Sequence, residues 1–272
     1  MSFEDILRER LRRWVPATDL DSALDIALSL NSGGIIPTLN HLGERTVQAR
    51  EVQENVEEYL SLARAGIHRR ASFSISIKPS QLGGLIDPSL LKQNVVTLLG
   101  GMRESDARLF VDAEDETITD LSWSALRDVV STEANLVLTV QANHSAAFSR
   151  LSEISSLDAR ARLCRGGYRR PSGRAGFEEC VLKALGAFPP SRLVVATNSP
   201  RVVRFVFANS GVARPEIETL QGIHSGAEQV ARRLGLQLRR YVPYGENWIE
   251  YCKRRDPWFV ENERRIIRYL HP

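Results

Sequence analysis

Apolar residues recur along the chain with two alternating periods. Short runs rich in aliphatic and β-branched residues predict buried strands, and longer stretches with an apolar residue every third or fourth position predict helices. The predicted strands cover residues 35–39, 73–77, 108–112, 136–141, 161–164, 193–197, 216–220 and 236–242. The helices predicted after them cover residues 46–65, 88–99, 121–130, 145–154, 176–185, 200–208 and 226–234, with a last one starting at Asn247.

Eight strand–helix units at fairly even spacing indicate an α/β protein whose parallel strands close into a TIM-like (β/α)8 barrel. The competing interpretation is an open doubly wound sheet. No Gly-x-Gly-x-x-Gly follows the first strand, and the number of units is the one that a barrel needs. Both observations favour the barrel.

Helical periodicity also occurs outside this series, at residues 3–15 and 19–30 before the first strand and at residues 258–270 after the last unit. We therefore expect three parts. They are an N-terminal helical segment (residues 1–32), the barrel (residues 33–257) and a C-terminal amphipathic helix (residues 258–272).

Composition excludes several classes of protein. The chain has 272 residues, of which 43% are hydrophobic, so it can bury a full core. A net charge of +3 without basic runs argues against a nucleic-acid partner. No apolar run reaches the length of a membrane span, and no secretory signal is expected. Three cysteines and five scattered histidines predict a reducing cytoplasm and no metal site.

The last strand leads into the most informative segment, Tyr241-Val-Pro-Tyr-Gly-Glu-Asn-Trp-Ile-Glu-Tyr-Cys-Lys-Arg-Arg255. Asn247 is the expected N-cap of its helix, and Asp256-Pro257 ends that helix. Helical spacing places Trp248, Tyr251 and the Arg254/Arg255 pair on one face. Two guanidiniums beside aromatic rings can bind a carboxylate or a phosphate, although a solvated basic helix end remains the alternative.

Polar residues also gather at the C-terminal ends of the predicted strands, where barrel enzymes carry their catalytic groups. They are Lys78, Asp112, Gln141, Arg162, Arg165, Thr197, Asn198 and Tyr241. Arg165-Gly-Gly167 suits a pyrophosphate but is also an ordinary turn sequence. No Ser-His-Asp set or acid/base carboxylate pair is evident, so the pattern favours a cofactor that performs the chemistry.

Several blocks, taken together and in order, resemble the monofunctional bacterial proline dehydrogenase family over about residues 13–255. The matching blocks are Arg13-Trp-Val15, Leu42-Gly-Glu44, Ser76-Ile-Lys78 with Gln81-Leu-Gly83, Val111-Asp-Ala-Glu114, Gln141-Ala142, Arg162-Leu-Cys-Arg-Gly-Gly-Tyr168, Ala196-Thr-Asn198, and Tyr241-Val-Pro-Tyr-Gly245 with Tyr251 and Arg254-Arg255. The last block is the most specific. The resemblance implies a flavin-dependent barrel that oxidises L-proline to 1-pyrroline-5-carboxylate by hydride transfer to N5 of FAD.

The resemblance also implies roles for individual residues. Lys78, Arg254 and Arg255 would hold the substrate carboxylate, while Tyr241, Tyr251 and Leu163 would contact the ring. Asp112 would organise the pocket beside the flavin, and Arg162 would lie near N5, which makes the expected catalytic set Lys78, Asp112, Arg162, Tyr241, Tyr251, Arg254 and Arg255. The expected FAD contacts are Asp112, Gln141, Arg162, Arg165, Gly166, Gly167, Tyr168, Thr197 and Asn198.

The same resemblance implies a small cyclic amino acid as substrate and an electron acceptor such as a quinone. The protein would be cytoplasmic, or peripheral to the inner membrane through its electron acceptor, and the oligomeric state stays open. Asn143, Arg165, Gly167, Asn198 and the Asp256-Pro257 break depart from the family pattern. Two alternatives therefore remain, a dehydrogenase of a proline analogue in a specialised pathway and a non-catalytic barrel with a binding role. An unrelated phosphate-binding barrel is disfavoured, because the positive groups are spread over several strands.

Overall fold

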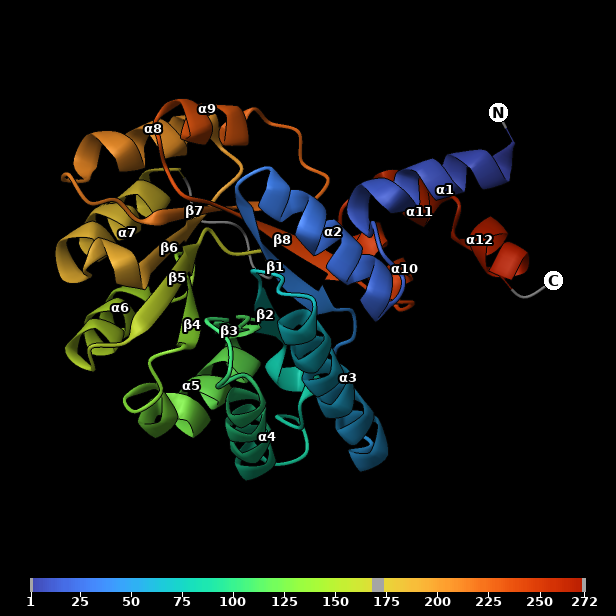
Figure 1. Cartoon of the computed structure of the whole chain (residues 1–272), viewed down its shortest axis with the longest axis horizontal. Coiled ribbons are helices and arrows are strands. Elements are labelled where there is room, and N and C mark those ends of the chain that lie inside the picture. The colour runs from blue at the N-terminus through green and yellow to red at the C-terminus, as the bar shows by residue number, and fades with distance from the viewer. Residues whose placement is uncertain (1, 168–173, 271–272) are drawn as a thin grey trace.

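A computed structural model describes residues 2–167 and 174–270, except for the side chains of Arg174 and Ala175. Eight parallel strands pair in chain order and close into a barrel, which confirms the predicted fold class (Figure 1). The strands are β1 Ile35–His41, β2 Ser74–Ile77, β3 Leu109–Val111, β4 Leu136–Gln141, β5 Arg160–Cys164, β6 Leu193–Ala196, β7 Glu216–Leu220 and β8 Leu238–Tyr244.

Helices cover the outside of the barrel, and short 3-10 turns at Pro79–Gln81 and Pro190–Arg192 complete two of the connections. The helices that follow the strands in turn are α3 Ala49–His68, α4 Pro88–Gly101, α5 Glu116–Val130, α6 Ala147–Ser156, α7 Arg174–Ala187, α8 Pro200–Asn209, α9 Ala227–Arg233 and α10 Trp248–Lys253. Side chains cap several N-termini, as Asp115 does for α5 and Ser199 for α8.

The last helix of the series does not cover the barrel in the regular way. Instead α2 (Leu20–Ser32), which precedes β1 in the chain, packs against β1 and lies across the closure of the barrel (Figure 1). The α10 helix packs against α11 (Pro257–Glu261), away from the wall of the barrel. It thereby leaves the helix layer and approaches the end of the barrel where the strands finish.

Two kinds of core result from the alternation of side chains along each strand. Outward-facing residues such as Ile75 and Leu109 meet the helices in one continuous apolar layer. Inside the barrel, by contrast, Phe110 is the largest member of a small apolar cluster. Its ring lies between the guanidiniums of Arg162 and Arg239, at 4.9 and 5.3 Å. Charged residues therefore fill much of the barrel interior.

The lower part of that interior is an ion-pair network at the N-terminal ends of the strands. Glu216 on β7 pairs with Arg239 on β8 and with Arg108, whose Nη1 lies 2.7 Å from Glu216 Oε1. Arg239 Nη1 also donates to Ser74 Oγ at 2.9 Å. Glu216 thus lies between two guanidiniums, so each arginine at the bottom of the barrel has a carboxylate beside it.

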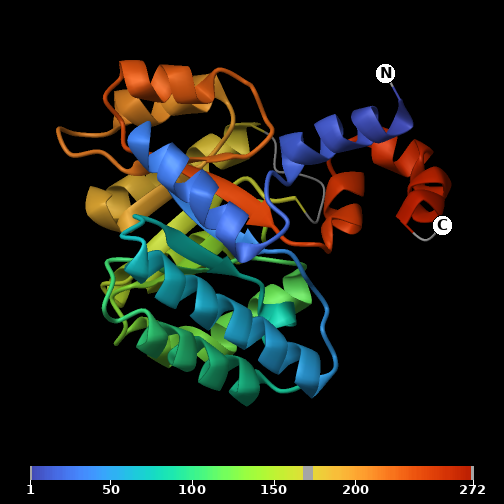
Figure 2. The same cartoon turned by 45° about the vertical axis from the view of Figure 1, so that its right-hand side comes forward.

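The helices at the two ends of the described chain form an arm beside the barrel. Figure 2 shows α1 (Phe3–Trp14) lying along α11 and α12 (Glu263–Leu270), with α10 between this arm and the strands. A second apolar cluster joins them, and it includes Leu7, Trp14, Tyr251 and Phe259. None of the helices described is both long enough and apolar enough to cross a membrane.

Candidate functional site

Asp112, directly after β3, is the centre of a polar cluster at the mouth of the barrel. Its carboxylate accepts hydrogen bonds from Ser76 Oγ at 2.6 Å, Lys78 Nζ at 2.8 Å and Tyr241 Oη at 2.7 Å, and it forms an ion pair with Arg162. Burial would raise the pKa of Asp112, but the charges of Lys78 and Arg162 outweigh burial and hold that pKa well below its usual range. Asp112 is therefore a permanent anion and a poor proton acceptor.

Arg162 on β5 extends the cluster across the barrel. Its Nη1 donates to Glu218 Oε2 at 3.1 Å, and its Nε donates to Thr139 Oγ1 at 2.9 Å. Glu218 also accepts from Thr38 Oγ1 at 2.7 Å. Burial opposes the charge of Arg162, yet the carboxylates of Glu218 and Asp112 raise its pKa above the ordinary value. The guanidinium is thus fixed in position and charge by groups from several strands.

Glu218, Thr139 and Thr38 were not predicted as members of the site. A signal for Glu218 was present, since Glu216 and Glu218 stand two residues apart on one strand and must face the same side. A strand that carries two charges on one face needs partners there. Applied as well to β5, where Arg160 and Arg162 stand two residues apart, this reasoning would have placed a charged network inside the barrel.

A cavity of about 350 Å³ opens over this cluster at the C-terminal ends of the strands. Its volume lies within the range of ligand pockets, which is roughly 300–1,000 Å³. The residues predicted from the strand ends that line it are Lys78, Asp112, Gln141, Arg162, Thr197, Asn198 and Tyr241, and Gly166, Gly167 and Arg255 join them. The structure therefore brings most of the candidate residues to one place.

The loops after β4 and β5 form one wall of this cavity. Gln141 on β4 donates through Nε2 to Glu114 O at 2.7 Å and accepts from Gly167 N at 3.4 Å. Gly166 has a φ of +98°, and a Cβ there would lie 1.9 Å from Asn143 Oδ1, so only glycine fits. A Cβ at Gly167 would meet no atom of the described residues within 4 Å, and Gly167 lines the cavity.

Other predicted cofactor contacts have different surroundings. Asn198 Oδ1 accepts from Leu220 N at 2.9 Å, and Thr197 Oγ1 accepts from Ser199 N at 3.1 Å, so both side chains also hold the local backbone. Arg165 is exposed to solvent. Tyr168 lies outside the described residues.

The two adjacent arginines after α10 point to different places. The Arg255 guanidinium carbon stacks 3.4 Å from the centre of the Tyr251 ring, and its Nη1 donates to Tyr251 O at 3.1 Å. Arg254 instead donates to both carboxylate oxygens of Glu44, at 2.6 and 3.1 Å. Arg255 lines the cavity described above, whereas Arg254 lines a neighbouring one. The predicted pair is present in sequence but separated in space.

Helix α10 begins after Asn247 and ends before Pro257, as predicted, but its N-terminus is not capped by a side chain. Asn247 is the N-cap residue, yet its side chain makes no capping bond and donates to Leu42 O at 3.4 Å instead. The helix ends at Lys253, and α11 begins at Pro257 with Asp256 as its N-cap. The predicted break at Asp256-Pro257 is therefore confirmed.

Two buried polar atoms in this region have no hydrogen-bond partner among the residues that the structure describes. They are Tyr251 Oη and Arg255 Nε. Burial raises the pKa of Tyr251 to about 12, so its hydroxyl stays protonated. Since buried polar groups are nearly always satisfied, these atoms are suited to receive a polar ligand.

The neighbouring cavity has a volume of about 720 Å³ and shares Lys78 with the first. Glu44, Arg254 and Tyr251 contribute to it, and Glu51, Glu54 and Glu58 of α3 form its acidic wall. Lys78 is the residue that lines both cavities, so they lie side by side at the barrel mouth.

Leu163 is not placed as the sequence led us to expect. Alternation along β5 turns Arg162 and Cys164 towards the cavity and Leu163 to the opposite face. The Leu163 side chain is fully buried in the apolar layer between strands and helices, and it lines neither cavity. Leu163 therefore packs in the apolar core, and the predicted contact with the substrate ring is not possible from this position.

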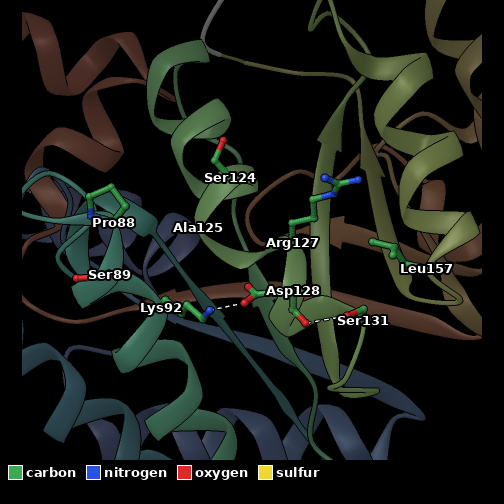
Figure 3. A pocket seen from close by; sticks show the side chains of 9 residues that line it. All are labelled: Pro88, Ser89, Lys92, Ser124, Ala125, Arg127, Asp128, Ser131 and Leu157. Carbon is green, nitrogen blue, oxygen red and sulfur yellow. Dashed lines mark hydrogen bonds and ion pairs between the residues drawn. The ribbon is translucent and has the colours of Figure 1, made fainter.

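A third depression lies on the outside of the molecule, between α4 and α5 (Figure 3). It has a volume of about 580 Å³, and its charged residues include Lys92 and Asp128, which pair with each other. It lies on the helix layer and includes none of the strand-end residues, so the barrel mouth is the better candidate site. Within residues 2–167 and 174–270, no group of three or more His, Cys, Asp or Glu could hold a metal ion.

Several known proteins are similar to this chain over most of its length. The family profile described as proline dehydrogenase matches residues 23–170. Proline dehydrogenase 2 of Bacillus subtilis (strain 168) is 23% identical over 278 residues, which cover 94% of this chain and 91% of the relative. The proline dehydrogenase of Deinococcus radiodurans is 26% identical over 278 residues, which cover 93% and 88% of the two chains.

Solved structures share the fold. Proline utilization A from Bdellovibrio bacteriovorus, inactivated by N-propargylglycine, superposes with a TM-score of 0.79 at 16% identity. A Bradyrhizobium japonicum proline utilization A variant gives a TM-score of 0.74 at 18% identity. The matches cover 95% and 93% of this chain but only 33% and 30% of those chains, so this chain spans about a third of their length.

Proposed function

Because the chain belongs to the proline dehydrogenase family, we propose that it oxidises L-proline to 1-pyrroline-5-carboxylate at the mouth of its barrel with FAD as cofactor. The observation that carries the proposal is the Asp112 cluster, in which Lys78, Arg162 and Tyr241 converge on one carboxylate beside a cavity. A barrel without catalytic function has no physical need for a buried cluster of this charge at its open end.

The residues present fit a flavin. The cavity wall offers the Arg162 guanidinium and the Gln141 amide, and Gly166 and Gly167 also line it. Cationic and amide donors suit the polar edge of an isoalloxazine ring, and an exposed arginine (Arg165) directly before a glycine pair suits a pyrophosphate. Gln141, Arg162, Arg165, Gly166, Gly167, Thr197 and Asn198 would therefore hold FAD, without a covalent link.

The substrate carboxylate would be bound by Arg255, Arg254 and Lys78. Arg255 Nε is buried and has no partner among the described residues, and Lys78 lies where the two cavities meet. Arg254 would exchange its bond to Glu44 for one to the substrate. Tyr241 and Tyr251 would pack against the ring, and the Tyr251 hydroxyl would gain the polar partner that it lacks.

A flavin, when bound, would supply a hydride acceptor. The ring carbon next to nitrogen would lose two electrons and one proton to it as hydride, and the ring nitrogen would lose a second proton to solvent water as the imine forms. Asp112 does not take this proton, because its pKa is held low by Lys78 and Arg162. Its work is to hold Lys78, Tyr241 and Arg162 in place, so positioning supplies much of the rate.

A larger or substituted proline analogue is a second candidate substrate. The departures from the family pattern at Asn143, Asn198 and Asp256-Pro257 favour a pocket that is altered on the side away from the carboxylate. Plain L-proline remains the first proposal, because each group that would hold its carboxylate and ring is present. The oxidised electron acceptor would be a quinone or a similar two-electron carrier.

The test begins with the absorption spectrum of the purified protein, in which a bound flavin gives characteristic bands. Reduction of a dye acceptor is then followed with L-proline, ring-substituted prolines and pipecolate. Turnover of L-proline above the others supports the first proposal, and preference for an analogue supports the second. A colourless protein that also fails to bind added FAD would indicate the non-catalytic barrel.

A further inference from the structure

Asp256 lies at the junction between α10, which precedes the two arginines, and α11, which follows them. Its Oδ1 accepts from Trp258 N at 3.1 Å and caps α11, while its backbone N donates to Cys252 O at 2.9 Å. The residue is 8% exposed. Burial alone would raise the pKa of the Asp256 carboxyl. The hydrogen bonds from Trp258, Trp14 and Arg10 lower it by more than that, so the pKa lies below its ordinary value. Asp256 is thus a buried, ionised junction residue.

The charge that balances Asp256 comes from the far end of the described chain. Arg10 on α1 donates Nη1 to both carboxylate oxygens, at 3.0 and 2.8 Å, and Trp14 Nε1 lies 3.4 Å from Oδ2. The Arg10 guanidinium also lies 5.1 Å from the centre of the Trp258 ring. A single carboxylate therefore connects α1, the end of α10 and the start of α11.

The same contacts reach the proposed substrate site through Tyr251 and Arg255. Trp14 of α1 and Tyr251, whose ring Arg255 stacks on, belong to one apolar cluster. Arg255 immediately precedes Asp256, and the backbone N–H groups of both residues donate to Cys252 O, at 3.0 and 2.9 Å. A change in the position of Asp256 must therefore move Arg255.

We propose that Asp256 is a positioning residue for the substrate carboxylate, and that α1 is part of the substrate site although it touches no substrate. This inference rests on the proposed function, in which Arg255 binds that carboxylate. The Arg10–Asp256 pair fixes the angle between α10 and α11 and so sets where the Arg255 guanidinium lies. A misplacement of an arginine by about 1 Å is enough to weaken binding strongly.

The test compares two arginines of the same helix. Arg10 pairs with Asp256, whereas Arg8 pairs with Glu4 of its own helix and contacts Tyr269 of α12, so Arg8→Met is a control that leaves the Asp256 junction intact. The probe is tetrahydrofuran-2-carboxylate, a proline analogue with oxygen in place of the ring nitrogen, which binds as a carboxylate but cannot form an imine. Its Kd is measured by titration of the flavin absorbance in the full chain.

We expect the Kd of the probe and the KM for L-proline to rise about tenfold in Arg10→Met and in Asp256→Asn. The flavin content and kcat should stay close to those of the parent, and Arg10→Lys should recover part of the affinity. Equal Kd values in Arg8→Met and Arg10→Met would overturn the proposal. So would an equal fall of kcat and flavin content, because that pattern describes general damage to the fold.

A second measurement does not depend on flavin or on catalysis. Hydrogen exchange of the amides of Arg255 and Asp256 should speed up in Arg10→Met and not in Arg8→Met, since both amides are bonded at the junction. Unchanged protection would show that Arg10 does not hold this segment. If the parent protein binds neither FAD nor the probe, the proposed function fails, whereas the exchange result still decides whether α1 positions Arg255.

Discussion

Arg162 Nη1 and Glu218 Oε2 form an ion pair of 3.1 Å in which the two side chains are 4% and 3% exposed. The pair joins β5 to β7 across the barrel interior, beneath the cavity at its mouth. Together with Asp112, Glu218 places two carboxylates around one guanidinium. The electrostatic field above the pair is consequently smaller than a lone arginine would produce.

The first prediction follows from that balance. Glu218→Gln keeps the size of the side chain but removes a negative charge, so the field of Arg162 at a bound flavin becomes more positive. Reduction of the flavin adds negative charge, and we expect its midpoint potential to shift in the positive direction. Spectroelectrochemical titration of the flavin-loaded protein measures the shift. Glu216→Gln, made in the lower layer of the barrel, is the control and should have a smaller effect.

The second prediction separates the adjacent arginines. Loss of a charge-assisted hydrogen bond costs about 1.5–3 kcal/mol, so Arg255→Met should raise the KM for L-proline roughly tenfold or more. Arg254→Met should have a smaller effect, because the substrate must compete with Glu44 for that guanidinium. Steady-state kinetics with a dye acceptor give both values. If neither substitution alters KM, the two arginines do not bind the substrate carboxylate.

The third prediction concerns two buried tyrosines. Tyr251 Oη has no partner among the described residues, whereas Tyr244 Oη donates to Glu58 at 3.0 Å. An unsatisfied buried group costs about 1–3 kcal/mol. Tyr251→Phe should therefore leave the free energy of unfolding unchanged or raise it by about 1 kcal/mol, while Tyr244→Phe should lower it. Urea unfolding of both variants checks this, and a clear loss of stability in Tyr251→Phe would contradict it.

The fourth prediction is a pH dependence. The pKa of Asp112 is lowered in the folded protein, so its stabilising contribution is fully present above the unfolded pKa of about 4 and is lost as the pH falls towards the folded value. The difference in unfolding free energy between the parent and Asp112→Asn should therefore shrink as the pH decreases below about 4. Urea titrations between about pH 6 and pH 3 measure it. A difference that stays constant over this range is the contrary result.

The fold was predictable because each strand of a barrel is buried on both faces and stands out as a short apolar run. The ends of helices were harder to predict where the first or last turn is polar. Helix α5 begins at Glu116, before the predicted start at residue 121, because Asp115 caps a first turn that has little apolar periodicity. The role of α2 could not be predicted, since no local pattern tells which strand a helix will cover.

The site was predictable to the extent that parallel strands end together. Lys78, Asp112, Arg162 and Tyr241 meet for that reason, although they are far apart in sequence. Contacts such as Arg254 with Glu44 join positions 210 residues apart and depend on how α10 leaves the barrel. Nothing in the local sequence of either residue indicates such a partner.

The closure of the barrel has a consequence for how the chain is made. Strand β1 pairs along its whole length with β8, from Ile35 with Leu238 to His41 with Tyr244. Ala17, just before α2, accepts a hydrogen bond from Gly245 N at 3.1 Å. The partner of the first strand is therefore synthesised about 200 residues later. Such long-range pairing is slow, and one edge of β1 stays unpaired until β8 is available. On a ribosome, α2 can protect one face of β1 during that delay, but its hydrogen-bonding edge stays a target for other chains until Tyr244 has emerged.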